Sequence, residues 1–380
     1  MVEFLFWSSL LAVFYVYAGY PALVFFAGYF FNKKIGQDNI APPVTILIAA
    51  FNEEKCIEKT IQNKLALDYP GDRLEIIVIS DGSTDKTDEI VQNYAEQGVK
   101  LISQLPRAGK TAALNLAVPS ASGEILLFSD ANSIWTPEAL RNLVRNFNDP
   151  AVGYATGHMV YVNPDGALVG DGCSAYMKYE NFLRRHETRI GSVVGVDGGI
   201  DAVRKKLYKT MNPDQLPDFV LPLSVAEQGF RVVYEPEAVL REETLNDSSD
   251  EYRMRVRVAL RALWALFDKR QLLFDTANIV YAWQIWSHKV LRYLCFLSLI
   301  VAYLSNLFLC QEGKFFQLFF FIQNLIYLAA AITPKLKKIG INLKILNFVN
   351  YFTLLNIAAG HAFIKFLMGQ KQVFWTPRKG

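Results

Sequence analysis

The sequence predicts an α/β protein with a mainly parallel sheet flanked by helices, one N-terminal transmembrane helix and about three C-terminal ones. Two observations support this fold class. Strand-like and helix-like stretches alternate through the middle of the 380-residue chain, which is typical of βαβ units. Long apolar runs lie toward both ends, and the whole chain is 52% hydrophobic and only 20% charged. Such runs are typical of membrane spans.

The first apolar run, Phe4–Phe31, has 28 residues and no formal charge. It exceeds the roughly 20 residues that cross a bilayer, so we expect a tilt or a kink near Gly19 and Pro21. A cleaved signal peptide would need a basic start and a shorter apolar core, and neither is present. Lys33 and Lys34 follow the run, and positive charge next to a span favours the cytoplasmic side for the central region.

Four short apolar runs in the middle of the chain are predicted to be strands because they are rich in branched residues. They are Val44–Ala50, Glu75–Ser80, Lys100–Ser103 and Glu124–Ser129. Helical patterns separate them, at about Glu53–Leu67, Asp81–Gln97 and residues 110–118. Gly98 is a natural helix stop, and Pro137 suits the first turn of a further helix.

Polar residues follow three of these strands. They are Phe51-Asn52-Glu53, Asp81-Gly82-Ser83 and Asp130-Ala131-Asn132. Ligands of parallel sheets bind beyond the carboxyl ends of the strands, so the three clusters predict one shared site.

Three further spans are predicted near the C-terminus, at Tyr293–Cys310, Phe315–Thr333 and Ile345–Ile364. Four spans in all would place the basic tail outside, against the charge rule. The last segment carries three asparagines and His361, so one alternative is that it does not fully cross. Residues 272–290, with two tryptophans, resemble an interfacial segment.

The charge distribution excludes nucleic acid as the main partner. Residues 32–271 carry 28 Lys and Arg against 33 Asp and Glu, whereas residues 272–380 carry 11 against 2. A nucleic-acid binder needs its basic surface on the folded domain. Here the positive charge accompanies the apolar segments, which predicts membrane lipid as a partner.

Several common sites are disfavoured. Gly109-Lys110-Thr111 resembles the end of a P-loop, but Gln104 stands where its first glycine belongs, and no GxGxxG follows the first strand. The four histidines are scattered, and the four cysteines lack metal-type spacing, which disfavours zinc.

Each remaining motif also has a plain structural interpretation. Asp81 begins a stretch that can simply cap a helix, and Asp130 can be an ordinary turn residue. Asp218 can lie in a turn between helices. The arginines at 253, 257 and 261 share one helical face, which suits either anionic lipid or a phosphate group.

Taken in order, however, these motifs resemble the family-2 glycosyltransferases, the membrane-embedded group that includes cellulose and hyaluronan synthases. The matching stretches are Val44–Glu54, Ile76–Asp85, Arg107–Asn115, Ser129–Asn132, Val193–Tyr208, Leu216–Gly229 and Arg253–Leu266. The resemblance covers nearly all of residues 42–266.

The resemblance implies a GT-A type fold, a nucleotide-sugar donor, most often UDP-linked, and a divalent metal, Mg²⁺ or Mn²⁺. By position, Glu53 and Asp81 would contact the nucleoside, and Lys110 would lie near the diphosphate. Asp130 and Asn132 would stand at the DxD position that binds donor and metal.

On the acceptor side, the resemblance implies that Asp218 is the general base, with Gly229 eleven residues later. Arg253 and Arg257 would bind phosphate or acceptor. Three departures from the family pattern stand out: Asn132 replaces the second DxD acid, Pro217 replaces the acid before the base, and the QxxRW motif of processive synthases reads Met254-Arg-Val-Arg257-Val258.

The missing Gln and Trp favour transfer of single sugars. The resulting hypothesis is an inverting glycosyltransferase acting on a lipid-linked or polysaccharide acceptor at the cytoplasmic face of a bacterial inner membrane, in cell envelope polysaccharide biosynthesis. The alternatives are a processive polysaccharide synthase and a non-catalytic membrane protein that binds nucleotide-sugar. The expected parts are an anchor (1–34), a GT-A domain (42–268), an interfacial segment (269–290), a transmembrane region (291–368) and a basic tail (369–380).

Overall fold

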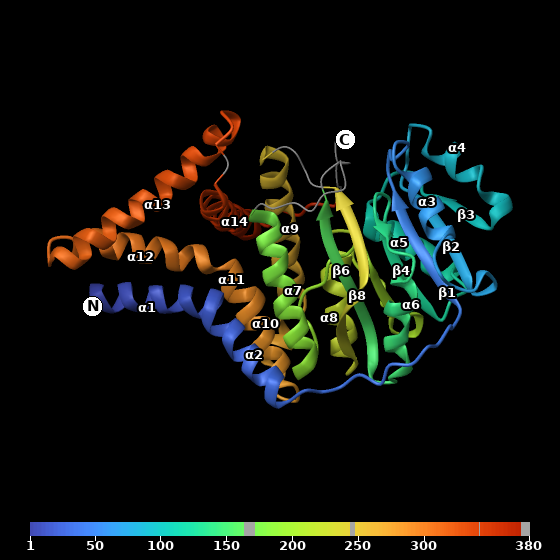
Figure 1. Ribbon diagram of the computed structural model, residues 1–380, viewed down its shortest axis with the longest axis horizontal. Helices are drawn as coiled ribbons and strands as arrows, with labels where there is room; N and C mark the ends of the chain where they lie inside the picture. The colour runs from blue at the N-terminus through green and yellow to red at the C-terminus, as the bar shows by residue number, and fades with distance from the viewer. Residues whose placement is uncertain (163–171, 244–247, 342, 374–380) are drawn as a thin grey trace. The chain divides into compact units, whose positions relative to one another are not determined.

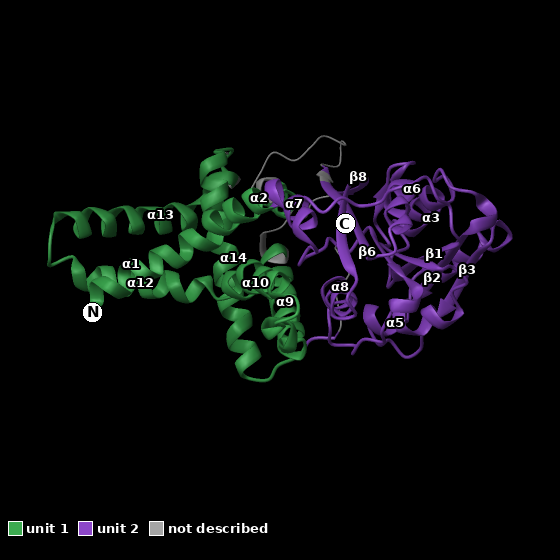
Figure 2. Cartoon of the chain, turned by 90° about the horizontal axis from the view of Figure 1, so that it is seen from below, with its two compact units in different colours: residues 1–27, 169–183, 245–371 green, residues 28–168, 184–244, 372–380 purple. Residues whose placement is uncertain are grey.

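A computed structural model describes residues 1–162, 172–243, 248–341 and 343–373. The chain forms two compact units, each built from separate chain segments (Figure 2). Unit 1 comprises Met1–Ala27, Val169–Leu183 and Leu245–Lys371; unit 2 comprises Gly28–Leu168, Arg184–Thr244 and Gln372–Gly380. The domain limits expected from the sequence remain a prediction.

Unit 2 is built on one sheet, which has eight strands in the described residues, in the order β3-β2-β1-β4-β7-β6-β8-β5 (Figure 1). The strands are β1 (Val44–Ala50), β2 (Leu74–Ser80), β3 (Val99–Ser103), β4 (Ile125–Asp130), β5 (Ile134–Trp135), β6 (Val152–Val162), β7 (Asp201–Arg204) and β8 (Arg231–Glu243). The helices of this unit are α3 (Ile57–Leu65), α4 (Thr87–Gln92), α5 (Lys110–Ala117), α6 (Ala139–Val144) and α8 (Pro217–Glu227).

The first four strands are parallel, and they confirm the strands predicted from the apolar runs. β1 pairs with β2 and β4, and β2 pairs with β3. Every residue of β1 is buried, which explains why its sequence is a continuous apolar run rather than an alternating one. The register places Ala50 opposite Ser80 and Ala49 opposite Asp130, so the three strands end at one edge.

The other half of the sheet is mixed rather than parallel. β7 pairs antiparallel with β4 and β6, β6 pairs parallel with β8, and β5 pairs antiparallel with β8. A regular strand–helix–strand alternation does not describe this half, because an irregular segment, 191–200, precedes the four-residue β7. The expectation of a mainly parallel sheet therefore holds for β1 to β4 only.

Unit 1 consists of helices in the described residues. They are α1 (Val2–Phe14), α2 (Tyr20–Phe30), α9 (Ser248–Asp268), α10 (Ile279–Ile285), α11 (Leu291–Tyr293), α12 (Cys295–Leu309), α13 (Lys314–Lys338) and α14 (Lys344–Leu367). The last three residues of α2 belong to unit 2. The first part of α7 (Gly172–Ile190) also belongs to unit 1, and its second part belongs to unit 2.

Two π-helical turns interrupt the apolar helices. One, Tyr15–Gly19, joins α1 to α2 directly before Pro21, where the sequence predicts a break. Proline has no amide hydrogen to donate within a helix, which favours an irregular turn at this position. The other, Trp286–Val290, joins α10 to α11.

Two helices in the described residues are long and apolar enough to cross a membrane, Val2–Phe30 and Lys314–Lys337. The pair Ile279–Tyr293 and Cys295–Leu309 adds a third if it is one span, bent by 54°. The segment Ile345–Ile364, expected either to span or not to cross fully, lies within helix α14, which is not among these candidates.

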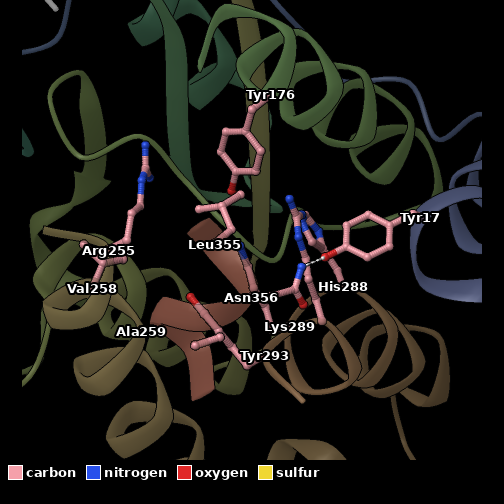
Figure 3. Close-up of a pocket in the computed structure, with 12 residues that line it drawn as sticks. Tyr17, Tyr176, Arg255, Val258, Ala259, His288, Lys289, Tyr293, Leu355 and Asn356 are labelled. Carbon is pink, nitrogen blue, oxygen red and sulfur yellow. Dashed lines mark hydrogen bonds between the residues drawn. The ribbon is translucent and has the colours of Figure 1, made fainter. Parts of the chain in front are cut away.

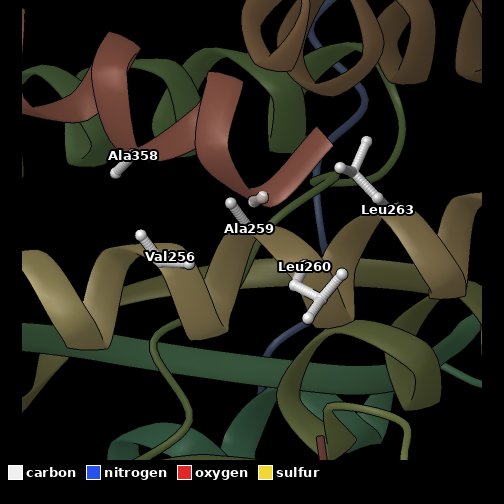
Figure 4. Close-up of a cluster of buried hydrophobic side chains, with 6 residues drawn as sticks. Val256, Ala259, Leu260, Leu263 and Ala358 are labelled. Carbon is white, nitrogen blue, oxygen red and sulfur yellow. The ribbon is translucent and has the colours of Figure 1, made fainter. Parts of the chain in front are cut away.

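Helix α14 packs against α9 instead. Their shared core includes Val256, Leu260 and Leu263 on α9 and Ala358 and Ala362 on α14 (Figure 4). The small residues of α14 let the two helix backbones approach closely. Figure 4 shows Val256, Ala259 and Leu263 on the side of α9 that is turned toward α14.

Candidate active site

The turn after β4 is held in place by α3. Asp130 ends β4, and the hydroxyl of Thr60 donates to the carbonyl of Ala131 at 2.6 Å. The ammonium of Lys64 donates to the carbonyl of Ser133 at 2.7 Å. Lys64 is fully buried, and burial holds its pKa well below the ordinary value. These two contacts fix the backbone on which Asp130 stands.

Lys110 forms an ion pair with the carboxylate of Asp130. It is the first residue of α5, directly after Gly109, whose φ of 96° suits glycine. Burial lowers the pKa of Lys110, but the charges of Asp130 and Asp218 raise it further, so the net pKa lies above the ordinary value. Lys110 therefore carries a positive charge at neutral pH.

Asp218 lies in the first turn of α8. Pro217, which departs from the family pattern, is the first residue of this helix, where a missing amide hydrogen costs nothing. The carboxylate of Asp218 lies against Gly198, which has a φ of 82°. A Cβ at residue 198 would overlap that carboxylate, so the loop approaches Asp218 as closely as only glycine allows.

An ion pair holds the loop that contains Gly198 in place. Arg184 pairs with Asp197 at 2.6 Å, and both side chains are about 95% buried. Arg184 also donates to the carbonyl of Gly195, and Asp197 accepts from the backbone of Met159. The segment that faces Asp218 is therefore rigidly held.

Some of these residues line one small cavity, which measures about 230 Å³ when the part open to solvent is included. Its lining comprises Lys110, Leu114, Phe128, Tyr154, Gly198, Asp201, Pro217, Asp218 and Leu221. The structure thus brings together three residues that the sequence proposed separately: Lys110 and Asp218 line the cavity, and Asp130 is paired to Lys110. Such a concave site with converging charged groups is typical of catalytic centres.

Asp201 is a member of this site that the motifs did not single out. It is the first residue of β7 and only 1% exposed. Burial, with the nearby charge of Asp218, raises the pKa of Asp201 to about 7. Tyr154 lies beside it. In the sequence, the only sign that Asp201 belongs to the site is its position as an acid within the matching stretch 193–208.

Asp81 is fully buried beneath the segment 104–109. Its carboxylate accepts hydrogen bonds from the backbone of Ala108 at 2.8 Å and Gly109 at 3.0 Å, and from the side chain of Gln104 at 2.5 Å. In a P-loop such backbone donors bind phosphate, whereas here a carboxylate occupies them. The sequence argument against a P-loop is consistent with this geometry.

The remaining predicted residues lie as follows. The Glu53 carboxylate accepts from the thiol of Cys56 at 2.9 Å, and Asn132 is partly exposed two residues beyond β4. Arg253 and Arg257 lie on α9, in unit 1, so they belong to a different unit from the cavity. Val373, from the C-terminal tail, lies against Gly109; a Cβ there would be 3.2 Å from its side chain.

No group of three or more His, Cys, Asp or Glu side chains in the described residues has the arrangement of a metal site. Asp130 and Asn132 still offer two oxygen-bearing side chains at a tight turn. Oxygen ligands of this kind suit Mg²⁺ or Mn²⁺ when a diphosphate supplies the remaining ones. The residues therefore fit a metal that arrives with its nucleotide.

Comparisons with known proteins give a consistent family. Residues 45–210 match the family model described as Glycosyl transferase family 2. The poly-beta-1,6-N-acetyl-D-glucosamine synthase of Staphylococcus aureus strain COL is 30% identical over 219 residues, which cover 56% of this chain and 52% of that protein. The synthase of the same name from Staphylococcus epidermidis is 26% identical over 295 residues, covering 73% of this chain and 70% of that protein.

A solved structure extends the likeness to the helical part. The mannosyltransferase PcManGT from Pyrobaculum calidifontis, in complex with GDP-Man and Mn²⁺, has a TM-score of 0.72 and 22% identity. The match covers 97% of this chain and 100% of that one, and at this identity it shows the fold alone. The chain spans about half the length of the S. aureus relative. Residues 45–210 therefore form a glycosyl transferase family 2 domain, in a chain of GT-A type fold.

Proposed function

We propose that the chain is an inverting glycosyltransferase that moves a sugar from a nucleotide-sugar, UDP-linked, to a lipid-linked or polysaccharide acceptor at the cytoplasmic face of a bacterial inner membrane. One observation carries the proposal. Asp218, a carboxylate, and Lys110, a partly buried cation paired with Asp130, line one cavity in a chain whose residues 45–210 match family 2. A base and a phosphate-binding cation on one cavity are what sugar transfer from a diphosphate requires.

In this mechanism Asp218 takes the proton of the acceptor hydroxyl as that oxygen attacks the anomeric carbon. The charge of Lys110 stabilises the departing diphosphate, and its pKa above the ordinary value keeps it protonated for this role. Glu53 and Asp81 lie on the nucleoside side. Because Asp81 is covered by the segment 104–109, we expect that segment to move when the nucleoside binds.

Asp130 and Asn132 would hold the divalent metal, Mg²⁺ or Mn²⁺, together with the diphosphate. When bound, the metal supplies positive charge to the leaving group. Because Asn132 has no charge, we expect metal affinity to depend on the nucleotide. Arg253 and Arg257 are proposed to bind phosphate or acceptor, as their spacing of four on α9 allows.

The name of the staphylococcal relatives supports N-acetylglucosamine as the first sugar to test. It also favours a second candidate function, processive polysaccharide synthesis. Against processivity, Met254 and Val258 replace the Gln and Trp of the processive motif. We therefore place single transfer first and let the size of the product decide.

The test is an assay of the purified full chain with a panel of nucleotide-sugars, in the presence of Mn²⁺, Mg²⁺ or a chelator. Turnover is measured as the release of free nucleotide. We expect turnover with a UDP-sugar, and UDP-N-acetylglucosamine is the first donor in the panel. Asp218→Asn should lower the rate by about 10³-fold or more, since it removes the base while keeping the shape of the side chain.

Asp214→Asn is the matched control, because Asp214 precedes α8 and does not line the cavity. Turnover that survives Asp218→Asn undiminished would remove the proposed base. Tight nucleotide binding without any turnover would identify a non-catalytic binding protein instead. A ladder of products, sized by mass spectrometry, would establish the processive alternative.

A further inference from the structure

A second cavity lies within unit 1, among its helices (Figure 3). Its volume, including the part open to solvent, is about 580 Å³. The lining residues are Tyr17, Tyr176, Arg255, Val258, Ala259, His288, Lys289, Arg292, Tyr293, Leu355, Asn356 and Ala359. None of the residues proposed for sugar transfer lines it.

Both π-helical turns of unit 1 contribute to this cavity. Tyr17 comes from the turn Tyr15–Gly19, and His288 and Lys289 come from the turn Trp286–Val290. The two turns contact each other, because the hydroxyls of Tyr15 and Ser287 are 2.8 Å apart. A π turn interrupts the regular helical hydrogen bonds, and such turns are frequent at functional sites. Their meeting at one cavity therefore makes this cavity a candidate binding site.

The cavity wall is cationic. Arg255, Lys289 and Arg292 carry formal positive charges, and no carboxylate is among the described lining residues. Two acids behind the wall balance it in part: Glu180 binds Arg292, and Glu251 binds Arg255 at 2.8 Å. Tyrosine hydroxyls add hydrogen-bond donors to these three cations. An anion with several oxygens fits this wall.

These cations come from apolar surroundings. Lys289 and Arg292 precede the 54° bend of the pair Ile279–Tyr293 and Cys295–Leu309, one of the candidate spans. Ionisable residues in membrane segments are costly and mark binding or transport sites. Buried Glu180, 2% exposed, stabilises the nearby cations where water is scarce.

Other lining residues are apolar, and one polar oxygen among them lacks a partner in the described residues. Val258, Leu355 and Ala359 supply apolar surface. Asn356, 6% exposed, donates to Tyr17 at 3.4 Å, while its Oδ1 has no hydrogen-bond donor among the described residues. The hydroxyl of a singly protonated phosphate ester can donate to this oxygen. Cationic and apolar lining residues in one cavity suit an amphiphile.

We propose that this cavity binds a phosphate group carried by a membrane lipid, with the phosphate at the cationic lining residues and the first part of the lipid chain at the apolar ones. The inference goes beyond the transfer reaction, since it assigns a second binding site in unit 1. Its ligand shares the chemistry of a lipid-linked acceptor.

The test is a titration of the purified full chain, in detergent and without nucleotide-sugar, with farnesyl phosphate, farnesol and inorganic phosphate, followed by microscale thermophoresis. We expect farnesyl phosphate to bind more tightly than either other probe. Lys289→Gln should raise its Kd by about tenfold, the effect of one charge-assisted hydrogen bond. Lys337→Gln, which removes an exposed lysine of α13 outside the cavity, should leave the Kd unchanged.

Arg292→Gln leaves Glu180 buried without its partner and can fail to fold, so Arg255→Gln serves as the second variant. Equal affinity for farnesol and farnesyl phosphate, or a Kd untouched by Lys289→Gln and Arg255→Gln, would overturn the proposal. Equal affinity for inorganic phosphate would assign a soluble phosphate as the source and overturn the lipid. Because no sugar donor is present, failure here leaves the proposed transferase activity intact, and Asp218→Asn should bind farnesyl phosphate normally.

Discussion

Asp201 couples the candidate active site to pH. Its folded pKa of about 7 lies above the ordinary value of 3.8. The unfolded chain therefore releases this proton at a lower pH than the folded chain does. The contribution of Asp201 to stability is complete below about pH 4 and is lost as the pH rises to about 7, a change of up to about 4 kcal/mol.

Asp201→Asn should flatten this dependence, because an amide does not titrate. We expect the Tm difference between pH 5 and pH 8 to be smaller in the variant than in the unmodified chain, as measured by differential scanning fluorimetry in detergent. Asp72→Asn, at an exposed acid of the same unit, is the control and should keep the original profile. An unchanged pH profile in Asp201→Asn would show that Asp201 is already ionised at low pH.

Among single residues, the sequence identified those that belong to motifs and missed those whose role depends on burial. Lys110, Asp130 and Asp218 were proposed from separate motifs, and the structure places Lys110 beside both acids. Asp201 and Lys64 look ordinary in sequence. Burial raises the pKa of Asp201, and the buried position of Lys64 lets it hold the turn after β4.

Among the elements, the strands were easier to predict than the helix ends. A fully buried strand such as β1 is a continuous apolar run that begins and ends sharply in sequence. The expected helix at about 53–67 is shorter in the structure, α3 beginning at Ile57, because a turn with Asn52 at a φ of 53° precedes it. β6 and β8 do not belong to a regular alternation of strands and helices, so their pairing depends on contacts between residues distant in sequence.

The packing of α14 on α9 gives a test at the level of elements. Ala362 is fully buried in the core that the two helices share. Ala362→Leu inserts three carbons where the helices meet, and overpacking of this kind costs about 1–3 kcal/mol. We expect a lower Tm of the full chain, measured by fluorimetry in detergent.

Ala331→Leu is the matched control, because Ala331 is exposed on α13. It should leave the Tm within about 1 °C, as expected for a surface substitution. If both variants have the Tm of the unmodified chain, α14 does not need its contact with α9 for stability.

For the whole molecule, the position of Val373 bears on the conflict in the charge count. Val373 lies against Gly109, and both belong to unit 2. We predict that the chain crosses the membrane an even number of times between unit 2 and residue 373, with the bent pair and α13 as the two candidate crossings. This topology would place residue 373 on the side where Lys33 and Lys34 predict the catalytic domain.

Reporter fusions test this topology in a bacterial host. Green fluorescent protein fused after Gly380 should fluoresce, because it folds in the cytoplasm, and alkaline phosphatase at the same position should be inactive. The fusion after Gly313, in the link between α12 and α13, should give the reverse pattern. An active phosphatase at Gly380 would require α14 to cross the membrane.

The two units are interleaved along the chain, and this limits which fragments of the protein can be expressed. Each unit is assembled from segments that lie far apart along the chain. A soluble fragment of residues 42–268 would retain α9 but lose α14, leaving the apolar face around Leu260 without its cover. Such a fragment should aggregate during expression, whereas the full-length protein, released from the ribosome with its last helix, can close both units at once.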